Sequence, residues 1–376
     1  MSFTALGLSP DLLKVLSNQN FTAPTPIQQS AIPAILSNKD ILGIAKTGSG
    51  KTASYVLPLL MNVQKAPRLK NRHVNVLVLV PTRELAEQVK EVFRTFSLGL
   101  SIPVKTLAVY GGVSINPQMT ALQGVNVLIA TPGRLLELVD SNAVYLSLIE
   151  TLVLDEADKM LNLGFKEEVD KIISLLPEKR QNILLSATLN ADLQAIHQVL
   201  LHDPLVIKIE AQEDSIEQIN QVAYIVSDEK KGPFLRYLIN HHEMQQVLIF
   251  ASSVHTADAI VNKLRKNNFD AKAIHSKKSQ GARNEALYLF KSGKLRILVA
   301  TDLMGRGIDI NQLPFVINYE LPRSPKDYIH RIGRTGRAGS VGEAISLVSP
   351  DELHHFEVIE KKMGKKVDMI DSERVK

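Results

Sequence analysis

A glycine-rich loop near the start of the chain has the residue types that cradle phosphate. The loop reads Ala45-Lys46-Thr47-Gly48-Ser49-Gly50-Lys51-Thr52, and it lies between an apolar run, Ile41–Ile44, and a helix-like segment, residues 53–62. Backbone amides of such a loop, with the N-terminus of the following helix, bind anionic oxygens. Lys51 is suited to reach the outer phosphates of a nucleotide, and the Thr52 hydroxyl to ligate magnesium. The alternative is a chance Gly/Ser turn before a helix, which the flanking strand and helix disfavour.

Two adjacent carboxylates have the chemistry that would complement a phosphate loop. Asp155 and Glu156 follow the apolar run Leu152–Leu154. Asp155 is suited to hold magnesium through water, because magnesium keeps much of its hydration shell. Glu156 is suited to polarise an attacking water. A surface acidic turn is the alternative, but the apolar strand before it and the phosphate loop upstream favour phosphoanhydride hydrolysis.

A cluster late in the chain is rich in arginine. It reads His330-Arg331-Ile332-Gly333-Arg334-Thr335-Gly336-Arg337. Arginine binds phosphate bidentately and stays charged, and an arginine finger from another domain speeds phosphoryl transfer by orders of magnitude. Arg334 and Arg337 are three residues apart, so both would face one ligand if the segment is helical. A generic basic patch for nucleic acid is the alternative.

A proline-stiffened loop, Phe21–Gln28, precedes the phosphate loop. The amide of Gln28 is both donor and acceptor, so it could read an adenine edge bidentately, and Phe21 could stack on the base. On this loop alone, a capped surface helix with a buried phenylalanine is the favoured interpretation.

The polar clusters follow short apolar runs, and helical segments lie between these runs. In the first part of the chain the runs are Val74–Val80, Val125–Ala130, Leu152–Leu154 and Ile183–Leu185. This alternation predicts a parallel α/β sheet. Ligands of such sheets bind beyond the carboxyl ends of the strands, which is where the polar clusters fall.

The same alternation restarts after a polar, acidic segment around residues 210–215. The later runs are Val247–Phe250, Ala271–Ile274, Leu295–Ala300 and Phe315–Tyr319. The sequence therefore predicts two α/β domains, each a mostly parallel sheet flanked by helices. We expect the first at residues 1–207, a linker at 208–219, the second at 220–365, and a short charged tail at 366–376. The charged stretch Lys361–Lys376 is expected to be frayed.

Composition excludes several classes of protein. The chain has 376 residues, of which 45% are apolar and 22% charged, and its net charge is +5, a mild preference for anionic partners. It contains no cysteine, which excludes disulfides and thiolate metal sites. No secretory signal or membrane-spanning run is evident, so a cytoplasmic protein without membrane contact is predicted. Aromatic residues make up only 5%, which disfavours extensive base stacking.

Together and in this order, the clusters resemble those of the DEAD-box RNA helicases of helicase superfamily two. The chain looks most like the short bacterial kind with little beyond the core, and the resemblance covers residues 3–365. It is carried by Phe3, Phe21–Gln28, Ala45–Thr52, Pro81–Ala86, Gly111-Gly112, Thr131–Arg134, Asp155–Asp158, Ser186–Thr188, Gln280, Arg283, Ala300–Asp309 and His330–Arg337. It implies two tandem RecA-like domains joined by a short linker.

The resemblance also implies a role for each matched residue. The residues expected to contact ATP are Phe21, Gln28, Thr47, Gly48, Ser49, Gly50, Lys51, Thr52 and Asp309, with magnesium at Thr52 and Asp155. Those expected to act in catalysis are Lys51, Glu156, His330, Arg334 and Arg337, and those expected to couple the nucleotide to strand separation are Ser186, Thr188 and Asp158. Those expected to contact RNA are Arg83, Gly111, Gly112, Thr131, Gly133, Arg134, Gln280, Arg283, Thr301 and Asp302, for which loop and helix-cap chemistry is the alternative.

The implied activity is that of an ATP-dependent RNA helicase, an RNA-stimulated ATPase whose lobes close on ATP, magnesium and RNA. It would separate short duplexes locally or remodel RNA–protein complexes. Contacts would go to backbone and 2′-hydroxyl groups, so base sequence should matter little. Three alternatives stay open: an ATP-gated RNA clamp or annealing chaperone, a DNA translocase of the same superfamily, and a nucleotide-binding scaffold. Ribosome-assembly and RNA-decay proteins are candidate partners.

Overall fold

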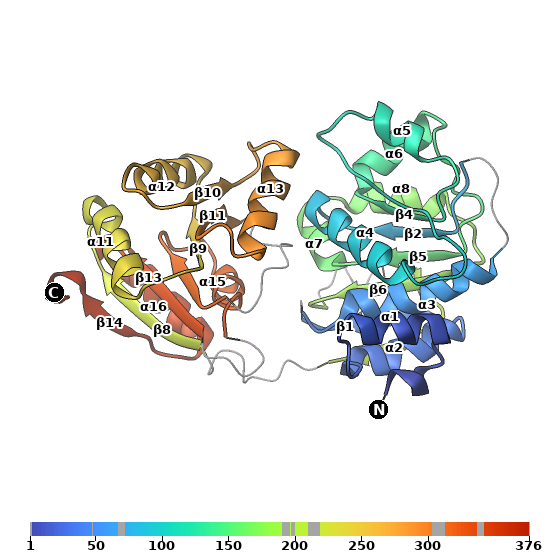
Figure 1. Cartoon of the computed structure of the whole chain (residues 1–376), viewed down its shortest axis with the longest axis horizontal. Helices are drawn as coiled ribbons and strands as arrows, with labels where there is room; N and C mark the ends of the chain where they lie inside the picture. Colours follow the sequence, from blue (N-terminus) through green and yellow to red (C-terminus); the bar gives the residue numbers. More distant parts are fainter. Residues whose placement is uncertain are drawn as a thin grey trace. The chain divides into compact units, whose positions relative to one another are not determined.

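The computed structural model describes residues 2–46, 48–66, 72–189, 196, 200–209, 219–302, 313–336 and 342–375. The chain divides into two compact units, Met1–Ala211 and Gln212–Lys376, each built on a parallel sheet (Figure 1). The expected fold class, two α/β domains in tandem, is confirmed, while the exact bounds at 207, 219 and 365 stay predictions. Within the described ranges, no helix is both long enough and apolar enough to cross a membrane.

The first unit holds a seven-stranded sheet. Its strands are β1 (Ile41–Ile44), β2 (Val76–Leu79), β3 (Thr106–Val109), β4 (Val127–Ala130), β5 (Thr151–Leu154), β6 (Gln181–Ser186) and β7 (Leu205–Lys208). They lie in the order β3-β4-β2-β5-β6-β1-β7, and every neighbouring pair is parallel. The central strands are almost continuously apolar because helices bury both faces of the sheet.

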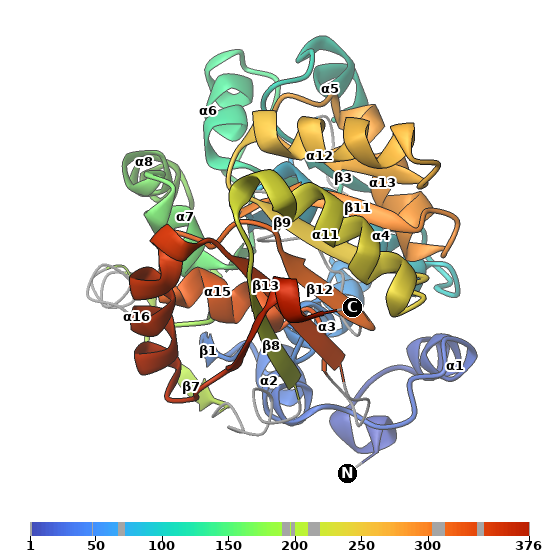
Figure 2. The same cartoon turned by 90° about the vertical axis from the view of Figure 1, so that its left-hand side faces the viewer.

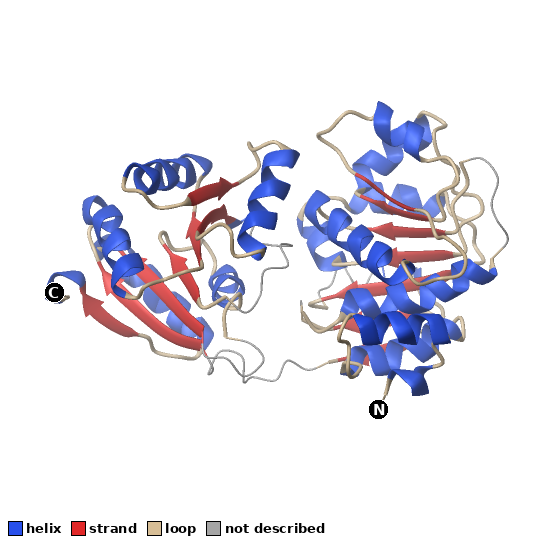
Figure 3. Cartoon of the chain, viewed as in Figure 1, coloured by secondary structure: helices blue, strands red, loops and turns tan. Residues whose placement is uncertain are grey.

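Helices cover both faces of this sheet (Figure 3). One face packs on η1 (Phe3–Leu6), α1 (Pro10–Asn18), α2 (Pro26–Leu36), α3 (Lys51–Lys65) and α4 (Arg83–Ser97). The other packs on α5 (Asn116–Ala121), α6 (Pro132–Asp140), α7 (Ala157–Asn162) and α8 (Lys166–Ser174). The side chain of Phe3, predicted from the family as an isolated upstream aromatic, is buried in the first of these cores.

The second unit repeats the topology of the first. Its strands are β8 (Ile219–Ile225), β9 (Val247–Ala251), β10 (Ala271–Ile274), β11 (Ile297–Thr301), β12 (Phe315–Asn318), β13 (Gly342–Val348) and β14 (Asp368–Asp371). They lie in the order β10-β11-β9-β12-β13-β8-β14, which is the order of the first sheet when each set is counted along the chain. One face packs on α11 (Asp228–His241) and α12 (Val254–Lys266), and the other on α13 (Gln280–Lys291), α15 (Pro325–Ile332) and α16 (Leu353–Met363) (Figure 2).

The end of the chain is ordered as far as Val375, so the expectation of a frayed tail is wrong. β14 pairs in parallel with β8, and the short helices η2 (Pro350–Glu352) and η3 (Ser372–Arg374) flank α16 and β14. An ion pair of 2.7 Å joins Lys230 Nζ to Glu373 Oε1. The physical reason is that a strand edge carries unpaired backbone groups, which a following segment can satisfy whatever its side chains.

Candidate functional site

The glycine-rich loop connects β1 to α3, and Lys51 is the first residue of that helix. Gly50 has φ +92°, and a Cβ there would lie 2.5 Å from Gln28 Nε2, so only glycine fits. Lys51 is buried, and its Nζ donates a hydrogen bond to the carbonyl of Ala45. The loop therefore gathers a cation, a helix N-terminus and backbone amides at the carboxyl end of β1.

The two residues predicted to contact adenine lie beside this loop. Gln28 is buried; its Oε1 accepts from Thr25 N at 3.0 Å, and its Nε2 donates to the carbonyl of Gly50 at 3.2 Å. The side chain thus holds the phosphate loop, and one hydrogen of its NH₂ group is left over. Phe21 is 41% exposed, with its ring edge-on to Phe96 at 5.4 Å. The buried phenylalanine favoured from the loop alone is therefore wrong.

The carboxylates of Asp155 and Glu156 follow β5. Asp155 is buried, and its Oδ1 accepts from the backbone N–H of Glu156 at 2.9 Å. Glu156 has the left-handed conformation φ 52°, ψ 46°, which is uncommon for a residue other than glycine and often marks a functional site. Its Oε1 forms a 2.8 Å ion pair with Lys159 Nζ. One oxygen of this carboxylate is therefore held, and the other is free to act on a ligand.

A tyrosine that the sequence analysis did not single out joins the loop to these carboxylates. Tyr55 is fully buried, and its hydroxyl donates to Asp155 Oδ2 at 2.9 Å. The Thr52 side chain, one turn earlier on α3, lies close to the same hydroxyl. The available sequence signal was spacing, because Tyr55 lies three residues after Thr52 and so faces the same way on α3.

Several buried polar atoms around the loop fit a polar ligand. Ser49 Oγ, Glu156 Oε2 and Asp158 Oδ1 are buried and have no hydrogen-bond partner in the part of the chain that the structure describes. No group of three His, Cys, Asp or Glu side chains suited to a metal occurs among the described residues. The Thr52 hydroxyl and the Asp155 carboxylate are hard oxygen donors, and such a sparse set fits magnesium, which keeps several waters.

The residues predicted to couple nucleotide and strand separation contact one another. Ser186, at the end of β6, donates from Oγ to the carbonyl of Thr188 at 2.7 Å. Thr188 Oγ1 donates to Asp158 Oδ2 at 2.9 Å. The loop after β6 is thereby tied to α7, the helix that follows the carboxylates.

Burial sets the electrostatics of the site. It lowers the pKa of Lys51, although Asp155, Glu156 and Asp158 raise it. Burial, and then the charge of Glu156, raise the pKa of Asp155 from its ordinary 3.8 to about 6. Burial and the charge of Asp155 raise the pKa of Tyr55 well above its usual range, so this hydroxyl keeps its proton.

We expect Asp155→Asn to stabilise the protein free of metal and nucleotide. Because the pKa is raised from 3.8 to about 6, ionisation of Asp155 opposes folding above about pH 6 and ceases to do so near pH 4. The rise corresponds to about 3 kcal/mol at most, so a gain of about 1–3 kcal/mol in the free energy of unfolding is expected at pH 7.5.

Urea unfolding of Asp155→Asn followed by circular dichroism, at pH 7.5 and pH 4.5, measures this gain, which should shrink at the lower pH. The exposed Asp170 on α8 gives the control Asp170→Asn, for which little change is expected at either pH. A loss of stability at pH 7.5 would show that the hydrogen bonds of the Asp155 carboxylate outweigh its burial.

Loops at the same edge of the first sheet bring the predicted RNA contacts together. Gly112 has φ +74°, and a Cβ there would lie 2.0 Å from Arg83 Nη2. Arg134 donates from Nη2 to the carbonyl of Val113 at 2.9 Å and pairs with Glu137 Oε2 at 2.8 Å. Two arginines thus hold the Gly111–Val113 loop. Thr131 is the N-cap residue of α6, and Gly133 has open space around it.

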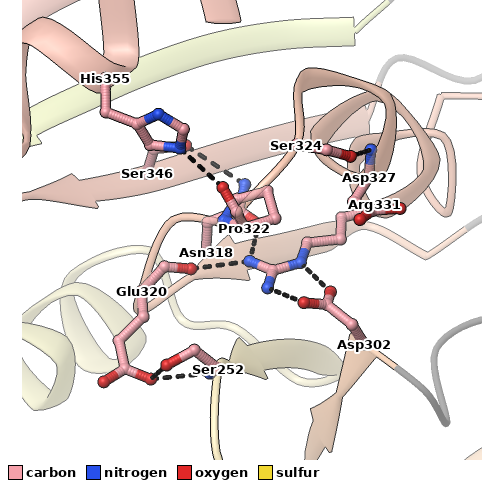
Figure 4. Close-up of polar contacts among 10 residues, drawn as sticks. All are labelled: Ser252, Asp302, Asn318, Glu320, Pro322, Ser324, Asp327, Arg331, Ser346 and His355. Carbon is pink, nitrogen blue, oxygen red and sulfur yellow. Dashed lines mark hydrogen bonds and ion pairs between the residues drawn. The ribbon is translucent and has the colours of Figure 1, made fainter.

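Every nitrogen of the Arg331 guanidinium donates a hydrogen bond (Figure 4). Its guanidinium binds both carboxylate oxygens of Asp302, with Nη2 to Oδ2 at 2.8 Å. Nη1 donates to Asn318 Oδ1 at 3.1 Å and to the carbonyl of Glu320 at 2.7 Å. Cζ lies 5.0 Å from the ring centroid of Phe250. This buried residue, which received no role from the sequence, joins the ends of β11 and β12 to α15.

The structure corrects one expectation about this segment. α15 ends at Ile332 with Gly333 as C-cap, and the carbonyl of Arg334 pairs with Leu313 N, so helical spacing between Arg334 and Arg337 does not hold. Arg334 is buried and His330 exposed. Arg337, Asp309 and Thr47 lie outside the described residues.

The remaining predicted RNA contacts of the second unit lie on α13 and at the end of β11. Gln280, the first residue of α13, accepts at Oε1 from Arg283 Nη2 and donates from Nε2 to Asn284 Oδ1 at 2.9 Å. Thr301 is the last residue of β11 and is buried. Asp302, which follows it, is bound by Arg331.

Comparisons with known proteins give matches along nearly the whole chain. The DEAD/DEAH box helicase family model matches residues 25–196, and the helicase conserved C-terminal domain model matches residues 230–339. The DEAD-box ATP-dependent RNA helicase CshA of Geobacillus kaustophilus is 38% identical over 360 residues, 95% of this chain and 76% of that protein. The protein of the same name from Bacillus subtilis is 36% identical over 369 residues, 98% of this chain and 74% of that protein.

Two solved structures resemble this chain over nearly its whole length. Saccharomyces cerevisiae Dbp5 bound to RNA and ADP BeF3 has a TM-score of 0.84 at 28% identity, over 99% of this chain and 96% of that chain. A DEAD box protein from the hyperthermophile Methanococcus jannaschii has a TM-score of 0.55 at 37% identity, over 98% of this chain and 99% of that chain.

Proposed function

The chain belongs to the DEAD/DEAH box helicase family and is an ATP-dependent RNA helicase, and we propose that it uses magnesium with ATP to separate short RNA duplexes locally or to remodel RNA–protein complexes. The observation that carries the proposal is the gathering of Lys51, Thr52, Asp155 and Glu156 at one edge of the first sheet. The hydrogen bond from Tyr55 connects α3, the helix that follows the loop, to the carboxylate of Asp155.

We assign the nucleotide contacts of the first unit to the residues around the loop. Backbone amides at Gly48–Thr52 and the Lys51 ammonium would hold the phosphates. Phe21 would stack on adenine, and the remaining Gln28 hydrogen would bond to it. Magnesium at Thr52 and Asp155, when bound, would neutralise phosphate charge.

Hydrolysis itself requires an oriented water and positive charge on the phosphate. Glu156 would orient the water through Oε2, since Lys159 holds Oε1. From the second unit, His330, Arg334, Arg337 and Asp309 keep the predicted roles at the nucleotide. The hydrogen bonds among Ser186, Thr188 and Asp158 support their proposed role in transmitting the state of the site.

We assign RNA binding in the first unit to Arg83, Gly111, Gly112, Thr131, Gly133 and Arg134. In the second unit it is assigned to Gln280, Arg283, Thr301 and Asp302. Backbone amides and guanidinium groups suit phosphate and sugar contacts, which carry no base sequence. Because Arg331 binds both oxygens of Asp302, any action of Asp302 on RNA would depend on Arg331.

We expect Gly112→Ala to weaken binding of single-stranded RNA by about 10-fold, the equivalent of one charged hydrogen bond. A methyl group there would displace the Arg83 guanidinium. Fluorescence anisotropy at one stated salt concentration measures the affinity. Gly124→Ala is a matched control, because Gly124 also has a positive φ, +71°, and its added Cβ would meet nothing within 4 Å. Equal losses in both variants would point to backbone strain alone.

Steady-state ATP hydrolysis tests the function directly. We would measure it alone, with single-stranded RNA, and with DNA of the same sequence, at one salt concentration. Stimulation by RNA only is expected. Equal stimulation by DNA would favour a general nucleic-acid translocase, and ATP binding without stimulation by either would favour a nucleotide-binding scaffold.

Strand displacement by Glu156→Gln, beside wild type, separates a helicase that needs hydrolysis from an ATP-gated clamp. We expect the variant to displace far less duplex over many turnovers, because the carboxylate that orients water is lost. Equal displacement by both proteins would favour the clamp. The cytoplasmic location and the ribosome-assembly or RNA-decay partners stay predictions.

A further inference from the structure

We propose that Tyr55 is a positioning residue for the magnesium that accompanies ATP, and that its hydroxyl orients the Asp155 carboxylate and ties it to α3, the helix that carries Thr52. The inference rests on the proposed function, because it concerns the same nucleotide site. Thr52 is on α3, and Asp155 follows β5, about one hundred residues later in the chain. Tyr55 therefore connects the two segments that would share the metal.

The direction of the hydrogen bond between Tyr55 and Asp155 follows from counting protons. A tyrosine hydroxyl has one hydrogen, and an ionised carboxylate can only accept, so Tyr55 donates to Asp155 Oδ2 at 2.9 Å. The single hydrogen of this hydroxyl is therefore committed to Asp155. Thr52 lies one turn before Tyr55 on α3, so the hydrogen bond fixes Asp155 relative to the helix that carries the second proposed magnesium ligand.

The Asp155 carboxylate is fixed at both oxygens. Oδ2 accepts from Tyr55, and Oδ1 accepts from the backbone N–H of Glu156 at 2.9 Å. Each oxygen keeps a further lone pair for water or metal. Hydrogen bonds of this kind orient metal ligands, and their loss typically weakens metal binding by about 10–100-fold.

Packing fixes the position of the hydroxyl. Tyr55 is fully buried in the core between the first sheet and its helices, with its ring centroid 6.4 Å from that of Phe93 on α4. A ring held in this way cannot turn its hydroxyl from Asp155 without disturbing the core. Orientation of the Asp155 carboxylate relative to α3 is therefore built into the folded first unit before any ligand binds.

Tyr55→Phe in the full chain tests the inference, because it removes the hydroxyl and keeps the ring. A fluorescent ADP analogue is bound while magnesium is titrated, and the magnesium concentration at half-maximal binding is read. We expect this concentration to rise by about 10-fold in Tyr55→Phe. Binding of the analogue in excess EDTA should differ by less than about twofold, because the contacts of the phosphates with the loop are unchanged.

A matched control is Tyr110→Phe. Its hydroxyl also donates to a carboxylate at 2.9 Å, Glu87 Oε1, but it lies away from the phosphate loop. We expect the magnesium dependence of this variant to equal that of wild type. A fraction of a variant that is irreversibly unfolded lowers only the signal amplitude and leaves the half-maximal magnesium concentration unchanged, whereas reversible unfolding would raise it by the inverse of the folded fraction.

The possible results distinguish a failure of the role proposed for Tyr55 from a failure of the proposed magnesium site. Unchanged magnesium dependence in Tyr55→Phe, with normal magnesium-dependent binding by wild type, would overturn the inference and leave the proposed function standing. An equal rise in Tyr110→Phe would also overturn it. Wild-type protein that binds no nucleotide, or binds it without regard to magnesium, would overturn the inference together with the magnesium site on which it rests.

Discussion

Lys51→Ala is expected to lower ATP turnover by about 100-fold or more, the loss typical of removing one preorganised donor from a reacting group. Lys51 is buried at the N-terminus of α3, where its Nζ donates to a neutral partner, the carbonyl of Ala45. A phosphate oxygen would be a stronger, charge-assisted acceptor than that carbonyl. The other lysine of the loop, Lys46, is exposed and lies five residues before the start of α3, so it does not replace the buried cation.

The control for this substitution lies on the same helix. Lys65, at the last turn of α3, is exposed, and Lys65→Ala removes the same number of atoms without touching the loop. Steady-state turnover with saturating RNA, and binding of a fluorescent ADP analogue, should both stay near wild type in Lys65→Ala. Near-normal turnover in Lys51→Ala would mean that the loop does not hold the reacting phosphates.

The residues with chemistry were predictable because of where they lie along the chain. Asp155 and Ser186 each follow an apolar run, and the ends of parallel strands meet at one edge of a sheet. The alternation of apolar runs with helical segments predicted both sheets and most of their central strands. The start of α1 was also predictable, since Ser9-Pro10-Asp11 is typical of a helix N-terminus and Ser9 accepts from Leu12 N.

What could not be predicted depends on partners distant in sequence. Tyr55 lies in an apolar stretch of helix and looks like an ordinary core residue until Asp155 is seen beside its hydroxyl. β14 has exposed residues at all four positions, so no apolar pattern marks it, and its backbone pairing with β8 alone makes it a strand. The end of α15 is set locally at Gly333, but the pairing of Arg334 with Leu313 is a tertiary contact.

Arg331→Met should destabilise the second unit strongly, by about 3–5 kcal/mol. Arg331 is buried, and its guanidinium is the partner of Asp302, Asn318 and the carbonyl of Glu320 (Figure 4). Methionine nearly matches the length of the side chain but donates no hydrogen bonds, so the Asp302 carboxylate would lose its cation. An uncompensated carboxylate and two unpaired oxygens account for the expected loss.

Hydrogen exchange in the full chain measures this loss locally, since peptides from β11, β12 and α15 report on the network while peptides from the first sheet serve as an internal reference. The matched control is Arg323→Met, because Arg323 is exposed two residues before α15 begins and its loss should leave exchange unchanged. Asp302→Asn in the Arg331→Met background should recover part of the protection, because it removes the unpaired charge. If Arg331→Met alone exchanged as slowly as wild type, the network would contribute nothing to stability, and its geometry would have to be explained by the predicted role of Asp302 toward RNA.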